Sequence, residues 1–155
     1  MDALEQLRQA VDAILLRQAD TQTRRNGFVH LYGVAGWCAL LALRRGLDAQ
    51  LAAAAGMLHD ISAYQTGDMT DHTRRSSDLA RQMLAATPAF TPPQVQQICD
   101  AILRHDEKLT THQPLDEVLK DADLMQHYLY NPALRSRKPP TDRLLATIRE
   151  LGITL

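Results

Sequence analysis

The fold is decided by the stretch Leu51-Ala52-Ala53-Ala54-Ala55-Gly56-Met57-Leu58-His59-Asp60. The small and apolar residues from Leu51 to Leu58 predict a helix buried in a core, because such a run has no polar face to turn toward water. This helix ends on the pair His59-Asp60. A carboxylate at the end of a buried helix loses its hydration, so it requires a partner that compensates its charge.

Helical periodicity extends from this stretch in both directions, with apolar residues recurring at steps of three and four. The sequence predicts a helix that starts near Asn26 as its N-cap and stops at Gly46, and a loop from Ser62 to Asp71. Thr91-Pro92-Pro93 predicts a helix start, since a capping hydroxyl precedes a proline at the first helical position. The other expected helices cover residues 3–18, 49–61, 72–86, 115–130 and 141–151.

No internal repeat and no β alternation is found, so we expect an all-α, single-domain bundle of about six or seven helices. The domain would span residues 1–155. Its core would lie in residues 26–130, and the helices over residues 3–18 and 141–151 would pack on that core. The first of these helices has a clean apolar face, which leaves open whether it docks on its own bundle or on a second chain in a homodimer.

Composition excludes several classes of protein. The chain has 155 residues, of which 45% are hydrophobic and 23% charged, with a formal net charge of −1. This is ordinary globular composition, and the near-neutral balance argues against general nucleic-acid binding, which requires a surplus of Lys and Arg. The longest uncharged run, Leu31 to Leu43, is shorter than the roughly 18 residues of a membrane span. Cys38 and Cys99 are too few for a disulfide framework, and the N-terminus lacks the regions of a signal peptide, so we expect a cytoplasmic protein.

Several of the six histidines stand at expected helix ends beside carboxylates. The pair His59-Asp60 ends one helix, Asp71-His72 opens another, and His105-Asp106 ends a third. Helix ends in a bundle can converge on one pocket, and imidazole with carboxylate is a ligand set for first-row transition metals. Spacing alone does not show that these side chains converge. The alternative for each histidine is a surface or hydrogen-bonded role.

The His and Asp residues stand in short segments that follow one another in a definite order. The segments are Gly27-Phe28-Val29-His30, Gly56-Met57-Leu58-His59-Asp60-Ile61-Ser62, Asp71-His72, Ile102-Leu103-Arg104-His105 and Lys120-Asp121-Ala122-Asp123-Leu124. On an all-helical frame, this ordered set resembles the HD-domain metal-dependent phosphohydrolase superfamily. The resemblance covers about residues 26 to 130, which is most of the chain.

The resemblance implies a divalent metal centre with one or two ions, and Asp60 would bridge the two. His and Asp ligands accept several ions, so the sequence does not distinguish Mn, Fe, Mg, Zn, Co and Ni. The core ligands carried over from the family are His30, His59, Asp60 and Asp123. Members with two metals add two histidines, which correspond here to His72 and His105.

The last predicted ligand, Asp123, has an alternative in Asp121, which stands two residues before it. Residues two apart on a helix point about 200° apart, so Asp121 and Asp123 should not both face one ion. The apolar pattern of this helix does not decide between them, and the resemblance favours Asp123. His112 and His127 have no place in the family pattern, so we expect them to be structural or surface residues.

The resemblance also implies hydrolysis at phosphorus, because a divalent metal lowers the pKa of its bound water toward neutrality. Asp60 would orient the attacking water. Phosphate substrates require cations, and Arg75 and Lys108 each follow a motif histidine by three residues. We therefore expect Asp60, Arg75 and Lys108 to be catalytic, with a solvated surface charge as the alternative for each cation.

The sequence predicts a metal-dependent phosphohydrolase that acts on a nucleotide or another small phosphate ester, with no membrane and no general nucleic-acid partner. The main alternative is a metal- or nucleotide-binding regulatory module that has the same site without turnover. Two further alternatives are a metal-free helical adaptor and an oxygenase with two irons. A lack of bound metal would identify the adaptor, and oxygen consumption would identify the oxygenase.

Overall fold

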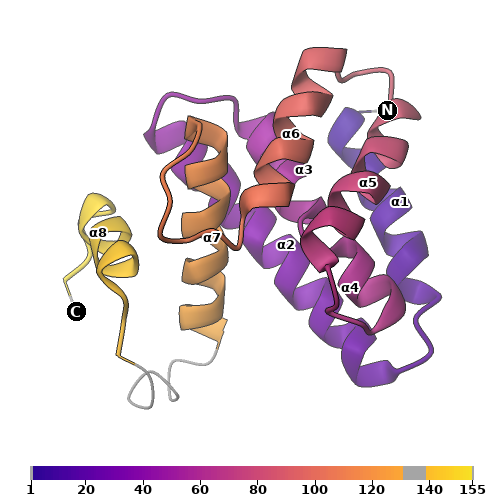
Figure 1. Ribbon diagram of the computed structural model, residues 1–155, viewed down its shortest axis with the longest axis horizontal. Coiled ribbons are helices and arrows are strands. Elements are labelled where there is room, and N and C mark those ends of the chain that lie inside the picture. Colours follow the sequence, from indigo (N-terminus) through magenta and orange to yellow (C-terminus); the bar gives the residue numbers. More distant parts are fainter. Residues whose placement is uncertain (1, 131–138, 155) are drawn as a thin grey trace.

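The computed structural model describes residues 2–130 and 139–154, which form helices joined by short connections (Figure 1). The described ranges contain no strand, so the expected all-α class is confirmed. In chain order, the helices are α1 (Ala3–Leu16), α2 (Thr21–Arg44), α3 (Ala49–Leu58), α4 (Ile61–Thr66), α5 (His72–Ala85), α6 (Pro92–Arg104), α7 (Pro114–Tyr130) and α8 (Asp142–Glu150).

Helices α2 and α3 form the centre of the bundle. Every residue of α3 from Leu51 to Leu58 is buried, as its composition predicted. Gly56 lets the two helices approach closely, because a Cβ at this position would lie 2.7 Å from the Cα of Ala35 in α2. This contact brings the end of α3, where the His59-Asp60 pair stands, against the middle of α2.

Several helix boundaries differ from the expectations, and the helix expected over residues 49–61 ends at Leu58. Helix α2 begins at Thr21 rather than after Asn26, because the Asp20 carboxylate accepts a hydrogen bond of 2.7 Å from the Thr23 amide and caps the helix earlier. The segment expected to be a loop after residue 61 contains α4, which Gly67 ends in a left-handed conformation with φ 76°. Because α4 is short and contains polar residues, its sequence shows no apolar repeat, although its first residues are buried.

The expected start of α6 is confirmed. Thr91 is the N-cap, and its backbone amide donates to the Gln94 side chain at 2.9 Å in a capping box, with Pro92 at the first helical position. This firm start and the C-cap at His105 define both ends of a helix that packs beside α5 and α7. His105 is thereby held at the inner end of α6.

The terminal helices differ in how they join the bundle. One face of α1 is buried in the main core through Leu4, Leu7, Val11 and Leu15, so this helix packs on its own chain. Helix α8 lies to one side, against α7 (Figure 1). It belongs to a small second apolar cluster, whose buried members are Met125, Leu144 and Ile148.

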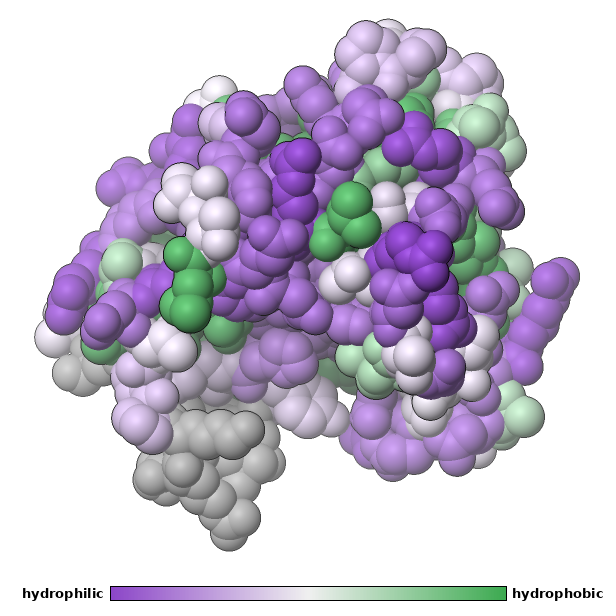
Figure 2. Space-filling view, viewed as in Figure 1, coloured by the Kyte–Doolittle hydropathy of each residue, from purple (hydrophilic) through white to green (hydrophobic). Residues whose placement is uncertain are grey.

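One helix of the described ranges, α2, is long and apolar enough to cross a membrane by its length and composition alone. A buried core helix passes the same test, and 44% of the most apolar window of α2 is buried inside the bundle. The face of the molecule shown in Figure 2 is mostly hydrophilic, with hydrophobic residues scattered singly. The absence of a membrane segment therefore stays a prediction.

Candidate metal centre

Helix ends converge on one point of the bundle and carry His and Asp side chains to it. His59 caps the end of α3, Asp60 follows it directly, His72 is the first residue of α5, and His105 caps the end of α6. Residues within two longer helices, α2 and α7, face the same point. The structure thus brings together the six residues expected to bind metal, namely His30, His59, Asp60, His72, His105 and Asp123.

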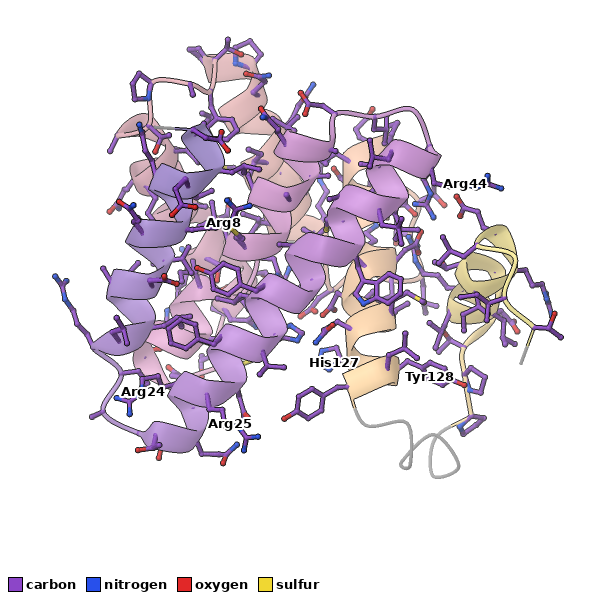
Figure 3. The ribbon with its side chains drawn as sticks, turned by 180° about the vertical axis from the view of Figure 1, so that it is seen from behind. Arg8, Arg24, Arg25, Arg44, His127 and Tyr128 are labelled. Atoms are coloured by element: carbon purple, nitrogen blue, oxygen red, sulfur yellow. The ribbon has the colours of Figure 1, made fainter. Side chains whose placement is uncertain are left out.

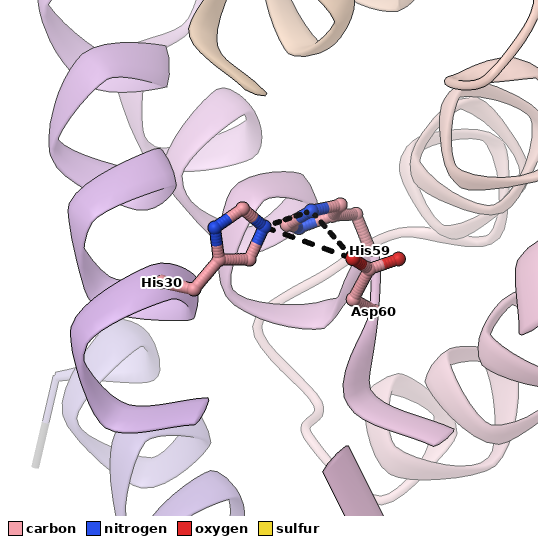
Figure 4. Close-up of side chains that lie close together, drawn as sticks. All are labelled: His30, His59 and Asp60. Atoms are coloured by element: carbon pink, nitrogen blue, oxygen red, sulfur yellow. Dashed lines mark hydrogen bonds and ion pairs between the residues drawn. The ribbon is translucent and has the colours of Figure 1, made fainter. Parts of the chain in front are cut away.

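The first group of ligand atoms consists of His30 Nε2, His59 Nε2, Asp60 Oδ2 and Asp123 Oδ1 (Figure 4 shows the first three residues). The two nitrogens lie 3.1 Å apart. Asp60 Oδ2 lies 3.7 and 3.4 Å from them, and Asp123 Oδ1 lies 3.4 and 3.6 Å from them. Ligand atoms placed tetrahedrally at about 2.1 Å from an ion are roughly 3.4 Å apart, so these separations fit a metal.

The second group consists of His72 and His105, whose Nε2 atoms lie 3.4 and 3.3 Å from Asp60 Oδ1. The two carboxylate oxygens of Asp60 are thereby divided, with Oδ2 facing the first group and Oδ1 facing the second. This division is the arrangement that a bridging carboxylate requires. It matches the role that the family resemblance implied for Asp60.

Hydrogen bonds to backbone carbonyls set the tautomers of these histidines. The Nδ1 atom of His59 lies 2.8 Å from the Gly56 carbonyl, and that of His105 lies 2.7 Å from the Ile102 carbonyl. A carbonyl only accepts, so each Nδ1 donates and each neutral ring presents a bare Nε2 to the centre. Such carbonyl bonds commonly orient metal-bound histidines.

Two carboxylate oxygens at the centre lack ordinary partners. Among the side chains that the structure describes, Asp60 Oδ1 and Asp123 Oδ1 are the buried polar atoms without a hydrogen-bond partner. Both lie 3.3 to 3.6 Å from histidine Nε2 atoms, and such contacts are favourable only where a cation, either a metal ion or a proton on the imidazole, lies between the two atoms. The donor set and these orphaned oxygens therefore fit a divalent metal ion.

The pKa shifts at the centre also show that the buried carboxylates require a positive charge beside them. Burial favours the neutral carboxyl of Asp60, but His59 and His105 hold its pKa well below the usual range. Burial would lower the pKa of His59, yet the Asp60 and Asp123 carboxylates raise it above its usual value. A proton on His59 thus compensates the carboxylates when no metal is bound, and metal uptake would displace it.

The structure also decides between the two neighbouring acids of α7. Asp123 faces the centre, whereas the Asp121 carboxylate binds Arg45 at 2.7 Å and Arg143 at 2.6 Å on another side of the helix. Asp123 therefore stays the predicted ligand, and its position at the centre supports that choice. Asp121 instead links α7 to α2 and α8.

The two expected substrate cations lie in different places. Lys108 Nζ contacts the centre, donating to Asp123 Oδ2 at 2.6 Å and to the His105 carbonyl at 2.7 Å. The guanidinium of Arg75 does not contact either ligand group and instead binds Asp68 and the Thr70 carbonyl at 3.1 and 2.9 Å. Helical spacing placed Arg75 near His72, but the connection between α4 and α5 supplies closer acceptors.

His127 was expected to be a structural or surface residue, and its side chain is 65% exposed, but it also lies beside the centre. Its Nε2 lies 3.3 Å from Asp123 Oδ1, and its ring centroid lies 4.7 Å from that of His30. Together His127, His30 and Asp123 offer a third group of atoms able to hold a metal. Figure 3 shows His127 on the side of α7 that faces α2. Its position four residues after Asp123, on the same helical face, is the sequence signal that was missed.

The chain matches the HD domain family over residues 27–128. No curated protein and no solved structure matches it. The matched region runs from α2 to α7 and includes every residue of the first and second ligand groups. With its ordered His and Asp segments brought to one centre, the chain belongs to the HD domain family, the superfamily of metal-dependent phosphohydrolases.

Proposed function

We propose that this protein hydrolyses a nucleotide or another small phosphate ester with the help of a divalent metal. Members of the HD superfamily are mostly metal-dependent hydrolases. The observation that supports the proposal best is the pair of buried carboxylate oxygens, Asp60 Oδ1 and Asp123 Oδ1, which lack a partner among the described residues and face histidine nitrogens. Such a cluster costs free energy unless it serves a cation.

Each ligand group would hold one ion. His30, His59, Asp60 and Asp123 would hold the first, and Asp60 with His72 and His105 would hold the second. A bound divalent metal supplies a water of lowered pKa and polarises a phosphoryl oxygen.

The chain's own residues position the reactants. Asp60 stands between the two groups, where a carboxylate oxygen can accept a hydrogen bond from the attacking water and orient it. Lys108 places an ammonium group on Asp123, at the edge of the centre. Its charge attracts an anionic phosphate, and its side chain is 23% exposed, so a substrate can reach it. Lys108 is therefore the cation that we assign to the substrate.

The test is hydrolysis of p-nitrophenyl phosphate, bis-p-nitrophenyl phosphate and a panel of nucleotides by chelator-treated protein, with and without added metal. We expect turnover to return with the metal. Asp60→Ala should abolish turnover while its circular dichroism stays helical, because the variant removes the carboxylate shared by both groups. Asp100→Ala is the control and should behave as wild type, because this half-buried acid of α6 binds Gln96 at 2.8 Å and belongs to neither ligand group. Metal-independent turnover, or turnover retained in Asp60→Ala, would overturn the proposal.

One observation favours the alternative, a regulatory module that binds a metal or nucleotide without turnover. Two arginines near the motif histidines are engaged elsewhere, since Arg75 binds Asp68 and Arg104 binds Asp116 at 3.0 Å. A hydrolase usually gathers more cations around its phosphate. Nucleotide binding by the metal-loaded protein, with no phosphate release, would favour this alternative.

A further inference from the structure

Asp106 contacts two of the predicted metal ligands. It follows His105 directly, in the connection between α6 and α7. Its carboxylate spans two histidines, with Oδ2 3.3 Å from His72 Nε2 and Oδ1 3.4 Å from His105 Nε2. These two nitrogens are the ones that also face Asp60 Oδ1. Two carboxylates and two imidazoles therefore share one small space.

The hydrogen bonds of the two histidines decide what can occupy that space. The Nδ1 atoms of His72 and His105 lie 3.1 and 2.7 Å from the carbonyls of Met69 and Ile102, to which they donate. In its neutral form each ring therefore presents a bare Nε2 atom to Asp106, so that both sides of each contact are acceptors. Acceptors at 3.3 to 3.4 Å repel one another unless a cation lies between them.

We propose that Asp106 is a further ligand of the second metal position, beside Asp60, His72 and His105. This inference rests on the proposed metal-dependent function. Without Asp106 the second position has three protein ligands, and with it the position has two imidazoles and two carboxylates, a set that suits several first-row divalent ions. The Asp106 side chain is 56% exposed and that of Asp60 is 10% exposed, so Asp106 closes the second position on its solvent side.

The local geometry of the connection holds Asp106 in this place. The Glu107 amide donates to the Arg104 carbonyl at 2.9 Å, and the Lys108 amide donates to the Asp106 carbonyl at 2.8 Å. The Lys108 side chain returns to the His105 carbonyl at 2.7 Å. The tight turn that results directs the Asp106 carboxylate back toward His105 and His72.

Glu107 provides a matched control. It is the next residue along the chain, carries the same charge, and has a side chain that is 54% exposed. Its carboxylate faces His112 at 3.3 Å rather than the metal position. Removal of the Glu107 charge therefore changes the charge of the connection without removing the proposed ligand.

The experiment titrates chelator-treated wild type, Asp106→Asn and Glu107→Gln with Mn²⁺ alone by isothermal titration calorimetry, with ion content checked by elemental analysis. Circular dichroism confirms that each variant is folded. We expect wild type and Glu107→Gln to bind two ions alike. Asp106→Asn should bind the first ion unchanged and the second with a dissociation constant raised about tenfold or more.

Each other outcome has a definite meaning. An unchanged second ion in Asp106→Asn would overturn the inference and leave Asp106 as a partner of protonated histidines. An equal weakening in Glu107→Gln would also overturn it, because the effect would then come from the charge of the connection. One ion in wild type would remove the second position and the inference with it, while the proposed function would stand. No ion in wild type would reject the proposed function as well.

Discussion

At the scale of single residues, the centre depends on which way each carboxylate points. Asp60 directs one oxygen to each ligand group, because its position just after α3 and before α4 places it between the two groups. Asp121 and Asp123 are separated by one residue and serve different purposes for the same reason, since a helix turns them to different sides. Residue type alone does not distinguish these roles.

Asp121 and Asp123 offer a paired test of this assignment. Asp123→Asn should lose metal from the first position and remain folded, because it removes a ligand and relieves an unpartnered buried charge. Asp121→Asn should keep its metal and lose roughly 1.5 to 3 kcal/mol of unfolding free energy, because it weakens charged hydrogen bonds to Arg45 and Arg143. Elemental analysis and urea denaturation measure the two effects. The reverse pattern would show that Asp121 is the ligand.

At the scale of elements, the site depends on how closely α2 and α3 pack. The two helices meet at Gly56, three residues before His59, and the His30 and His59 nitrogens lie 3.1 Å apart as a result. A metal centre tolerates little change in ligand spacing. The close approach of these helices therefore bears on metal binding as well as on stability.

A methyl group at Gly56 tests this dependence. Gly56→Ala would place a Cβ 2.7 and 2.8 Å from backbone atoms of Ala35, which cannot move as a flexible side chain would. We expect a loss of about 1 to 3 kcal/mol in unfolding free energy together with weaker metal binding. Gly36→Ala in α2 is the control, because its Cβ would meet no atom of the described chain within 4 Å. Denaturation and metal titration of both variants provide the measurement, and equal behaviour would contradict the packing argument.

At the scale of the whole molecule, charged side chains join α8 to the matched family region. Arg143 of α8 binds Glu117 at 2.7 Å and Asp121 at 2.6 Å in α7, and Arg45 binds both Asp121 and Glu150. Arg143 also reaches the Lys108 carbonyl at 3.3 Å, beside the centre. A helix beyond the family match is thus coupled to the connection that carries Lys108.

This ionic network predicts that the free energy of unfolding depends on pH in the acidic range. Burial would raise the pKa of Glu117, but hydrogen bonds from Lys120, the His112 amide and Arg143 lower it from 4.5 to about 2. A carboxyl with a lowered pKa in the folded state stabilises the fold above its unfolded pKa and loses that contribution as pH falls toward the folded value. Glu117 should therefore stabilise the protein above about pH 4.5 and lose this effect toward pH 2.

Glu117→Gln isolates that contribution. We expect the variant to be less stable than wild type at pH 7 and to lose less stability between pH 4.5 and pH 2. Urea denaturation at a series of pH values measures the difference. Parallel curves for the two proteins across this range would contradict the assigned pKa shift.

Much of the fold was predictable because local rules determine it. Apolar periodicity marked seven helices that the structure contains, and the Thr91-Pro92-Pro93 start was confirmed. The predictions from these rules were wrong at two places with polar residues, namely α4 and the start of α2 at its Asp20 cap. Neither the short helix nor the residues between the Asp20 cap and Asn26 contain an apolar repeat that would have predicted a helix.

The sequence by itself determined the helical class, the order of the His and Asp segments and the family to which they belong, because these features depend on local spacing along the chain. Tertiary structure alone decided which side chains reach the centre. It selected Asp123 over Asp121, added His127 and Asp106, and directed Arg75 to Asp68. The physical reason is that a side chain binds the nearest partner in space, and the packing of separate helices determines which partner is nearest.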